Sequence, residues 1–244
     1  MTDAHCHVSC GDASVREFVV GRDFFGVHPW ETVGRVDLDA SSIVSSLRAQ
    51  LISHPDAGVG EIGLDRLKER TISAAMREIF EAQLGLAIEL RRPVVLHGAK
   101  CWGQVVETVR RLMGRVGEPD PAQTFLFHGF SRSDGLIPDI VALNGYISVG
   151  PAILNDHAVN YRELARKIPA DRLLVETDRT EENAAECPHV RDVLAKLAEI
   201  RGDDLSSLVA QTDANADRFR GRFSRLLSGG AEEKGMKGCA NARR

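Results

Sequence analysis

The chain has 244 residues, of which 43% are hydrophobic and 27% charged, and its 31 basic and 35 acidic side chains leave a net charge of −4 at pH 7. This composition is ordinary for a globular protein, and the length fits one large domain such as an α/β barrel. The acidic balance argues against a protein that holds nucleic acid by bulk electrostatics. A nucleic-acid substrate would have to be held locally, by metal ions and a few cationic side chains.

The cysteines and the apolar segments give no sign of a secreted or membrane protein. Five cysteines are too few, and of the wrong parity, for a disulfide framework in a chain of this size. The opening residues MTDAHCHV lack the basic-then-apolar pattern of a signal segment. No stretch approaches the roughly 20 apolar residues that span a bilayer. We therefore expect a cytoplasmic protein.

Short apolar runs alternate with helix-like stretches along the chain. The runs, expected to be strands, cover 24–27, 57–62, 93–96, 125–127, 146–149 and 173–175. The stretches with helical spacing cover 71–91, 103–113, 135–143, 160–168, 189–200 and about 205–227. This order predicts a parallel sheet with crossover helices, either an α/β barrel or a doubly wound sheet.

The two ends of the chain are less regular. Little room for a full helix and strand lies between His7 and Phe24, so one unit should be abbreviated. We expect a distorted TIM-type (β/α) barrel with seven or eight parallel strands, formed by residues 1–227 as a single domain. Residues 228–244 are rich in Gly, Ala and charge without periodicity, which predicts a flexible tail.

Polar side chains stand where the predicted strands end. In α/β barrels the carboxyl ends of the strands converge on one rim, where active sites are built. The residues at these ends are His5, His7, His28, Glu61, His97, His128 and Asp178. Chance placement would explain one or two such residues but not this set.

Each of these residues also has a simpler interpretation. His5 and His7 lie two apart in a predicted strand and so face one side, yet an HxH pair near a terminus can be a surface pair. Glu61 lies between Gly60 and Ile62 in an apolar run, so it must be paired with an arginine or bound to metal. His97 and His128 are metal-ligand candidates or hydrogen-bonded core histidines.

The neighbours of these residues suggest supporting roles. Asp3 can orient a histidine from behind, and Glu176 shares a face with Asp178. Cys6 should point away from the histidines as a packed thiol. Asp65 is expected near the rim or in a turn. Asp178 can complete the shell of a metal ion and take a proton from the bound water.

Six segments together resemble the TatD family of metal-dependent hydrolases. They are DAHCH, GVHPW, GEIGLD, VVLHGAK, FHGFSRS and LLVETD, in the order of the family and spread from Asp3 to Asp178. The resemblance implies that His5, His7 and Asp178 hold one divalent metal ion, that His97 and His128 hold a second, and that Glu61 bridges the two. It also implies that Asp178 and Glu61 are catalytic, with Asp178 as the base.

The same resemblance implies a deoxyribonuclease that removes nucleotides from DNA ends, with magnesium, manganese or zinc as the two cations. Four imidazoles favour zinc or manganese, and the carboxylates also accept magnesium. The expected substrate is a DNA end or a small phosphodiester. His28 is implied to contact substrate phosphate rather than metal. No membrane association is expected, and a monomer is favoured over an obligate oligomer.

The loops that follow the ligand positions depart from the family pattern. Gly98-Ala99-Lys100 replaces a Ser-Arg-acidic stretch after His97, and Arg179-Thr180-Glu181 replaces Ala-Pro-Tyr after Asp178. These loops would touch substrate, so the departures leave its identity open. Lys100, Arg132 and Arg179 are candidate phosphate contacts by position or exposed cations of the rim. Trp30 and Trp102 are candidates for base stacking or for ordinary packing.

Two other functions fit the same residues. An amidohydrolase-type esterase or lactonase would use a similar barrel on a small molecule, although such enzymes often bridge their metals through a carboxylated lysine rather than a glutamate. A non-catalytic barrel that keeps a metal is the third possibility, but a structural zinc needs only four ligands. The larger ligand set favours the hydrolase.

Overall fold

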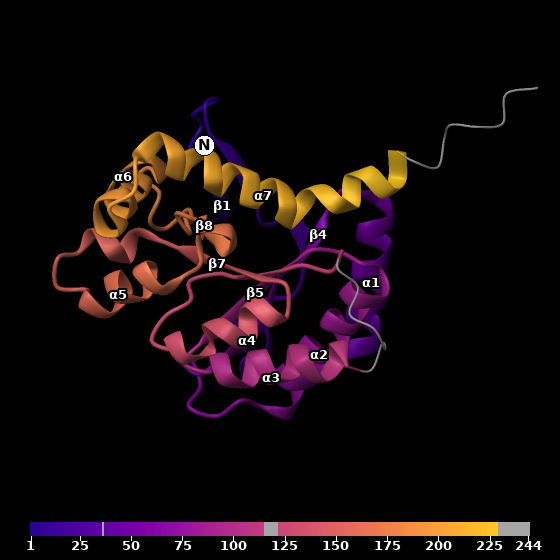
Figure 1. The fold of residues 1–244 in the computed structure, drawn as a ribbon. Helices are drawn as coiled ribbons and strands as arrows, with labels where there is room; N and C mark the ends of the chain where they lie inside the picture. The colour runs from indigo at the N-terminus through magenta and orange to yellow at the C-terminus, as the bar shows by residue number, and fades with distance from the viewer. Residues whose placement is uncertain (36, 115–121, 229–244) are drawn as a thin grey trace, which may run out of the picture.

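The computed structural model describes residues 1–35, 37–114 and 122–228 (Figure 1), and side-chain positions up to residue 220. Eight strands lie within these residues, in agreement with the predicted seven or eight. They are β1 (Thr2–Cys6), β2 (Arg16–Val19), β3 (Phe24–Phe25), β4 (Gly58–Asp65), β5 (Val94–Ala99), β6 (Phe125–Phe127), β7 (Gly145–Val149) and β8 (Leu173–Val175). The predicted flexible tail, apart from Ser228, falls outside the described residues.

The strands form a ring in chain order. β1 pairs with β2 in parallel, and β3 to β8 form a second parallel sheet in sequence order. A parallel bridge between Val20 and Phe24 joins the two sheets. On the other side the chain beyond β8 returns to β1, because the Asp178 amide donates to the His5 carbonyl at 3.0 Å and the His7 amide donates to the Arg179 carbonyl at 2.8 Å. The expected distorted barrel is thereby confirmed.

Helices follow the strands around the outside of the ring (Figure 1). The α-helices are α1 (Ala40–Ser53), α2 (Ala74–Glu89), α3 (Trp102–Met113), α4 (Ile137–Ala142), α5 (Val159–Lys167), α6 (Val190–Arg201) and α7 (Leu205–Ser228). Short 3-10 turns η1 (Pro29–Thr32), η2 (Asp134–Leu136), η3 (Pro151–Leu154) and η4 (Ala170–Arg172) fill the connections. No helix lies in residues 7–23, all of which are described, so the abbreviated first unit is confirmed.

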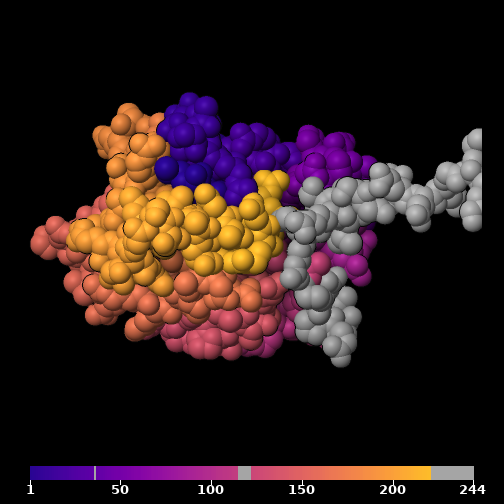
Figure 2. Space-filling model, turned by 45° about the horizontal axis from the view of Figure 1, so that its top comes forward, coloured from indigo at the N-terminus to yellow at the C-terminus, as the bar shows by residue number. Residues whose placement is uncertain are grey.

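The inside of the ring is closed at the amino ends of the strands by α7. One buried cluster joins Phe18 of β2, Phe24 of β3 and Tyr146 of β7 to Phe219 of α7, whose ring stacks on Phe24 at 5.9 Å. Figure 2 shows α7 (yellow) lying between the indigo N-terminal segment and the pink and orange residues from the second half of the chain. The Phe219 carbonyl also accepts a hydrogen bond from the Thr124 hydroxyl at 2.8 Å. This end of the barrel is therefore packed shut.

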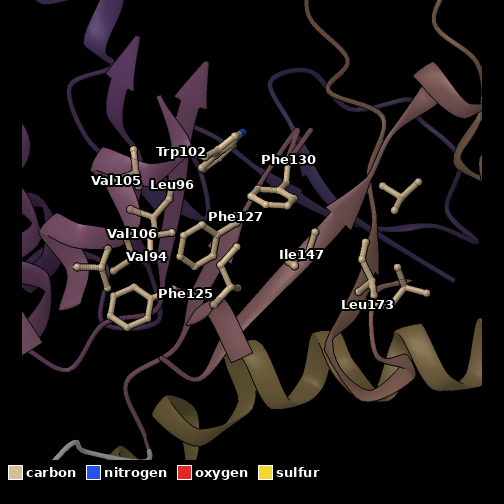
Figure 3. Packing of buried hydrophobic residues seen from close by; sticks show 14 of the residues in the cluster. Val94, Leu96, Trp102, Val105, Val106, Phe125, Phe127, Phe130, Ile147 and Leu173 are labelled. Atoms are coloured by element: carbon tan, nitrogen blue, oxygen red, sulfur yellow. The ribbon is translucent and has the colours of Figure 1, made fainter. Parts of the chain in front are cut away.

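A second, larger core lies between the strands and the outer helices. In Figure 3, Trp102 of α3 lies beside Phe127 and Phe130, and the ring centroids are 5.8 and 5.2 Å apart. The indole covers Gly98 so closely that a Cβ there would lie 2.2 Å from it. Trp102 is only 4% exposed, so it packs and does not offer a stacking surface to substrate.

Candidate metal centre

Strand β4 brings Glu61 into the middle of the barrel mouth. The backbone of β4 runs against β5 at Gly63, where a Cβ would lie only 2.0 Å from the His97 carbonyl oxygen. Any other residue would push the two strands apart, so glycine at this position allows β4 and β5 to pack closely. Glu61 is buried, with 3% of its side chain exposed.

The two carboxylate oxygens of Glu61 face different histidines. Oε1 lies 2.7 Å from His97 Nδ1 and 2.5 Å from His128 Nε2. Oε2 lies 3.3 Å from His5 Nε2 and 3.4 Å from His7 Nε2. The carboxylate therefore stands between two pairs of imidazoles, and no arginine is paired with it among the described residues, so the arginine salt bridge is not observed.

Asp178 completes the group around Oε2. Its Oδ1 lies 3.6 Å from His5 Nε2 and 3.5 Å from His7 Nε2, and half of its side chain is exposed. Asp178 has a φ of 50°, in the left-handed region, which Asp tolerates better than most residues. His5, in contrast, is fully buried, and neither of its ring nitrogens has a hydrogen-bond partner in the described structure.

A buried imidazole without partners is unfavourable unless another group satisfies it. Ligand atoms of His5, His7 and Glu61 lie within 4.8 Å of one another, as do those of His5, His128 and Asp178, and those of His28, Glu61 and His97. Nitrogen and carboxylate oxygen together suit zinc or manganese, and the carboxylates also suit magnesium. The residues present therefore fit divalent metal ions.

The second nitrogen of His97 is held by a residue that the sequence analysis left ambiguous. Asp65 is fully buried, and its Oδ2 accepts from His97 Nε2 and from Trp30 Nε1, both at 2.8 Å. Its Oδ1 accepts from the backbone amides of Leu67 at 2.5 Å and Lys68 at 2.9 Å. Asp65 therefore occupies the rim and the turn at once. A proton on His97 Nε2 leaves the Nδ1 lone pair facing Glu61.

His28 has the opposite arrangement. It caps the η1 turn, and its Nδ1 accepts from the Trp30 amide at 3.1 Å. A neutral His28 consequently carries its proton on Nε2, which lies 3.4 Å from Glu61 Oε1 and 3.4 Å from His97 Nδ1. The nitrogen that faces the centre is an N–H donor rather than a metal-binding lone pair.

The carboxylates and imidazoles shift one another's pKa. Burial alone would raise the pKa of Glu61, but the charge and hydrogen bond of His128 and the other imidazoles hold it well below its usual range. Burial would likewise lower the pKa of His128, yet the charges of Glu61 and Glu176 raise it. Hydrogen bonds to Asp178 and then to Glu61 raise the pKa of His7 to about 9. The centre attracts positive charge.

Two further carboxylates support the centre from behind. Glu176 lies 3.7 Å from His128 Nδ1, and its oxygens accept from the Gly129 amide at 2.7 Å and the Ser148 hydroxyl at 2.5 Å. Asp3 accepts from the Thr177 hydroxyl at 2.6 Å and from its amide at 3.0 Å. Asp3 also accepts from the backbone amide of His5 at 3.3 Å. We expected Asp3 to orient a histidine ring, but it holds the backbone of His5 instead.

The predicted position of Cys6 is confirmed, since its buried thiol donates to the Phe18 carbonyl at 3.8 Å. Cys6 could form a further ligand group with Asp3 and Glu17. Burial raises the pKa of this thiol well above its usual range, and metal binding needs the thiolate. The Asp3 oxygens are also engaged by Thr177. That group therefore lacks the features of the histidine centre.

The cationic residues predicted to contact phosphate differ in their exposure and in their contacts. Lys100 and Arg132 are exposed on the loops after β5 and β6, and both have a positive φ, 57° and 55°. Arg132 lines a hollow with Lys167 of α5. Arg179 is half-buried, and its Nε lacks a hydrogen-bond partner in the described residues, while its carbonyl joins the chain to β1. Trp30, 45% exposed, lies beside His97 with ring centroids 6.3 Å apart.

The sequence profile of a family described as TatD related DNase matches residues 13–221. The uncharacterized metal-dependent hydrolase YabD of Bacillus subtilis is 26% identical over 204 residues, which cover 80% of this chain and 75% of that protein. The 3′-5′ ssDNA/RNA exonuclease TatD of Klebsiella pneumoniae is 29% identical over 202 residues, covering 76% and 74%.

Solved structures share the fold. The TatD homolog YJJV of Escherichia coli superimposes with a TM-score of 0.65 at 24% identity, covering 86% of this chain and 78% of that one. A mutant organophosphorus hydrolase gives a TM-score of 0.55 at 18% identity, covering 74% and 62%. Among the described helices, none has the length and apolar character needed to cross a membrane.

Proposed function

This chain belongs to the TatD related DNase family of metal-dependent nucleases, and we propose that it uses two divalent metal ions to release nucleotides from DNA ends. The observation that carries this proposal is the carboxylate of Glu61, whose two oxygens face two separate pairs of imidazoles. A carboxylate so placed could contribute one oxygen to each of two cations, and a pair of cations would suit phosphoryl transfer.

The proposed ligand groups follow the two sides of Glu61. His5, His7 and Asp178 would hold one ion beside Oε2. His97 Nδ1 and His128 Nε2 would hold the other beside Oε1. When bound, such ions polarise the phosphodiester and lower the pKa of the attacking water. Zinc, manganese and magnesium are all compatible with this donor set.

The protein's own groups would then orient the substrate and move the proton. Asp178 is half-exposed, so its carboxylate can both face the imidazoles and accept a proton from the attacking water. His28 would donate from Nε2–H to a phosphate oxygen. Farther out, Lys100, Arg132 and Arg179 would contact phosphates of the substrate. Trp30 offers an exposed indole for stacking.

The substrate class follows from relatives and from charge. Several relatives bear the name 3′-5′ ssDNA/RNA exonuclease, and we propose a DNA end or a small phosphodiester as the substrate here. The net charge of −4 disfavours tight binding of long nucleic acid, so recognition would be confined to the mouth. We further propose that the protein acts as a monomer in the cytoplasm.

The test is metal-dependent cleavage of end-labelled single-stranded DNA, with chelator and His97→Ala controls. We expect chelator-sensitive release of nucleotides that His97→Ala lacks. A panel of ester and lactone substrates, run in parallel, tests the amidohydrolase-type alternative, which would use the fold that this chain shares with an organophosphorus hydrolase. Metal-loaded protein that cleaves a lactone but no diester would contradict the proposal.

A further inference from the structure

A recess of about 210 Å³ opens beside Asp178, between the carboxyl ends of β6, β7 and β8. Its apolar walls come from Phe130, Ile153 and Leu164, all at least 96% buried, and from the half-buried Tyr161. We call it the β7 recess. Because Asp178 lines it, the recess is continuous with the candidate metal centre and not a separate cavity.

The charge of the β7 recess excludes a phosphate as its occupant. No lysine, arginine or histidine is among the described residues that line it, whereas Glu176 and Asp178 are. The oxygens of Glu176 are already engaged by the Gly129 amide and the Ser148 hydroxyl. An anion would thus meet two carboxylates and no cation, so the recess disfavours an anionic group, and its apolar walls suit a neutral one.

A neighbouring hollow provides the contrast. It shares Leu164 with the β7 recess but is lined by Arg132 and Lys167, together with Asp134 and Glu163. Lys167 is paired there with Asp134, but the exposed Arg132 can contact a phosphate, whereas the walls of the β7 recess offer no cation. The volume of about 210 Å³ lies below the range of pockets that enclose whole drug-sized ligands, so it suits a single ring.

We propose that the β7 recess binds the base of the nucleotide being released, a neutral heteroaromatic ring, against the partly exposed ring of Tyr161, while the buried Phe130 only forms part of the apolar floor. The inference rests on the proposed phosphodiesterase function, because the phosphate must lie at the metal centre for its base to reach the recess. Because most of its wall is aromatic or aliphatic, we expect this subsite to tolerate different bases. The subsite would increase affinity for nucleotides over simple phosphate esters.

The test compares two product-like inhibitors on the metal-loaded enzyme. Methyl phosphate probes the metal centre alone, and thymidine 5′-monophosphate probes the metal centre and the recess together. With methyl p-nitrophenyl phosphate as the reporter substrate, we expect an inhibition constant for the nucleotide about tenfold below that of methyl phosphate, because packing of one base against the protein contributes about that much affinity.

Two variants locate the effect. Tyr161→Ala removes one wall, and Ala152→Phe narrows the recess from its exposed edge. Each should bring the nucleotide constant toward that of methyl phosphate and leave the latter unchanged. Val159→Ala, on the same helix as Tyr161 but 56% exposed and outside the lining, is the matched control and should change neither constant.

The outcomes separate the two proposals. A nucleotide that binds no better than methyl phosphate, or whose advantage survives both variants, overturns the β7 recess as a base subsite while diester hydrolysis still supports the proposed function. Failure of the proposed function has another signature: metal-loaded protein neither cleaves the diester nor binds methyl phosphate, and both proposals fall.

Discussion

The two ends of the barrel carry out different tasks with the same strands. At the amino ends, Phe219 of α7 stacks against Phe24 and closes the ring with apolar contacts. At the carboxyl ends, Glu61 gathers histidines from β1, β5 and β6 in a group rich in charge. In barrels of this type the closed end contributes stability and the open end contributes chemistry. Substitutions at the two ends should therefore affect different observables.

The largest effect is expected at Glu61. Glu61→Gln removes the charge that both imidazole pairs face, so it should lower diester hydrolysis by about 10⁴-fold, as loss of one member of a catalytic unit does. The number of bound metal ions, measured by elemental analysis, should fall as well. Retention of near-normal turnover with metal bound would show that Glu61 is not the bridge.

The opposite result is expected at the closed end. Phe219→Ala should reduce the free energy of unfolding by about 3–5 kcal/mol, because it opens a cavity in a fully packed cluster. Urea unfolding measures the loss. Turnover per folded molecule and metal content at low temperature should stay within a few-fold of the parent. A large fall in metal content with little loss of stability would contradict the assignment of stability to the closed end and of metal binding to the open end.

Asp65 should have an intermediate effect on metal affinity. In Asp65→Asn the turn amides of Leu67 and Lys68 keep the side-chain oxygen, so the NH₂ group faces His97 Nε2. His97 would then carry its proton on Nδ1, which faces Glu61. Titration calorimetry should show metal affinity about 10–100-fold weaker.

Trp30→Phe is the control for Asp65. It removes the other donor to Oδ2 and leaves His97 in its original tautomer, so metal affinity should be unchanged. If the two variants weaken metal binding equally, Asp65 acts by holding the loop in place rather than by fixing the tautomer of His97.

The ends also differ in how far the sequence predicts them. Every ligand-type residue at a strand end of the open mouth, from His5 to Asp178, lies where the alternation of runs places it, because parallel strands converge on one rim. The helix α1 is not predicted, because its serines at 41, 42, 45 and 46 are typical of a loop. Packing against α2 stabilises that helix, with Asp39 as its cap.

The dual role of Asp65 could not be predicted from the sequence, because it depends on tertiary contacts. The GEIGLD segment indicates a strand end, and Asp65 satisfies two turn amides as many aspartates do. Only the tertiary arrangement brings Trp30, 35 residues earlier, and His97, 32 residues later, to its other oxygen. The pattern of apolar runs predicts where the candidate ligands lie, but it does not predict the hydrogen bonds that they form.

The raised pKa of His7 predicts a pH dependence confined to the open end. Its pKa rises to about 9 in the folded protein from an ordinary value near 6.5, so its contribution to the stability of chelated protein is present in full below about pH 6.5 and lost as the pH rises through 9. Metal ions compete with that proton. The metal-induced rise in Tm should therefore increase between pH 6 and 9, and His7→Ala should flatten it.

The smallest effect is expected for a single cation on the rim. Lys100→Ala removes an exposed charge on the loop after β5, and one screened contact to a phosphate changes KM by only about 2–5-fold. The change should be seen with oligonucleotides at low salt and disappear near 0.5 M salt, where the screening length falls to about 4 Å. Arg110→Ala, near the end of α3, removes the same charge away from the mouth and should leave KM unchanged. Equal changes in KM for the two substitutions would mean that substrate binding depends on the net charge of the protein and not on a cation at the rim.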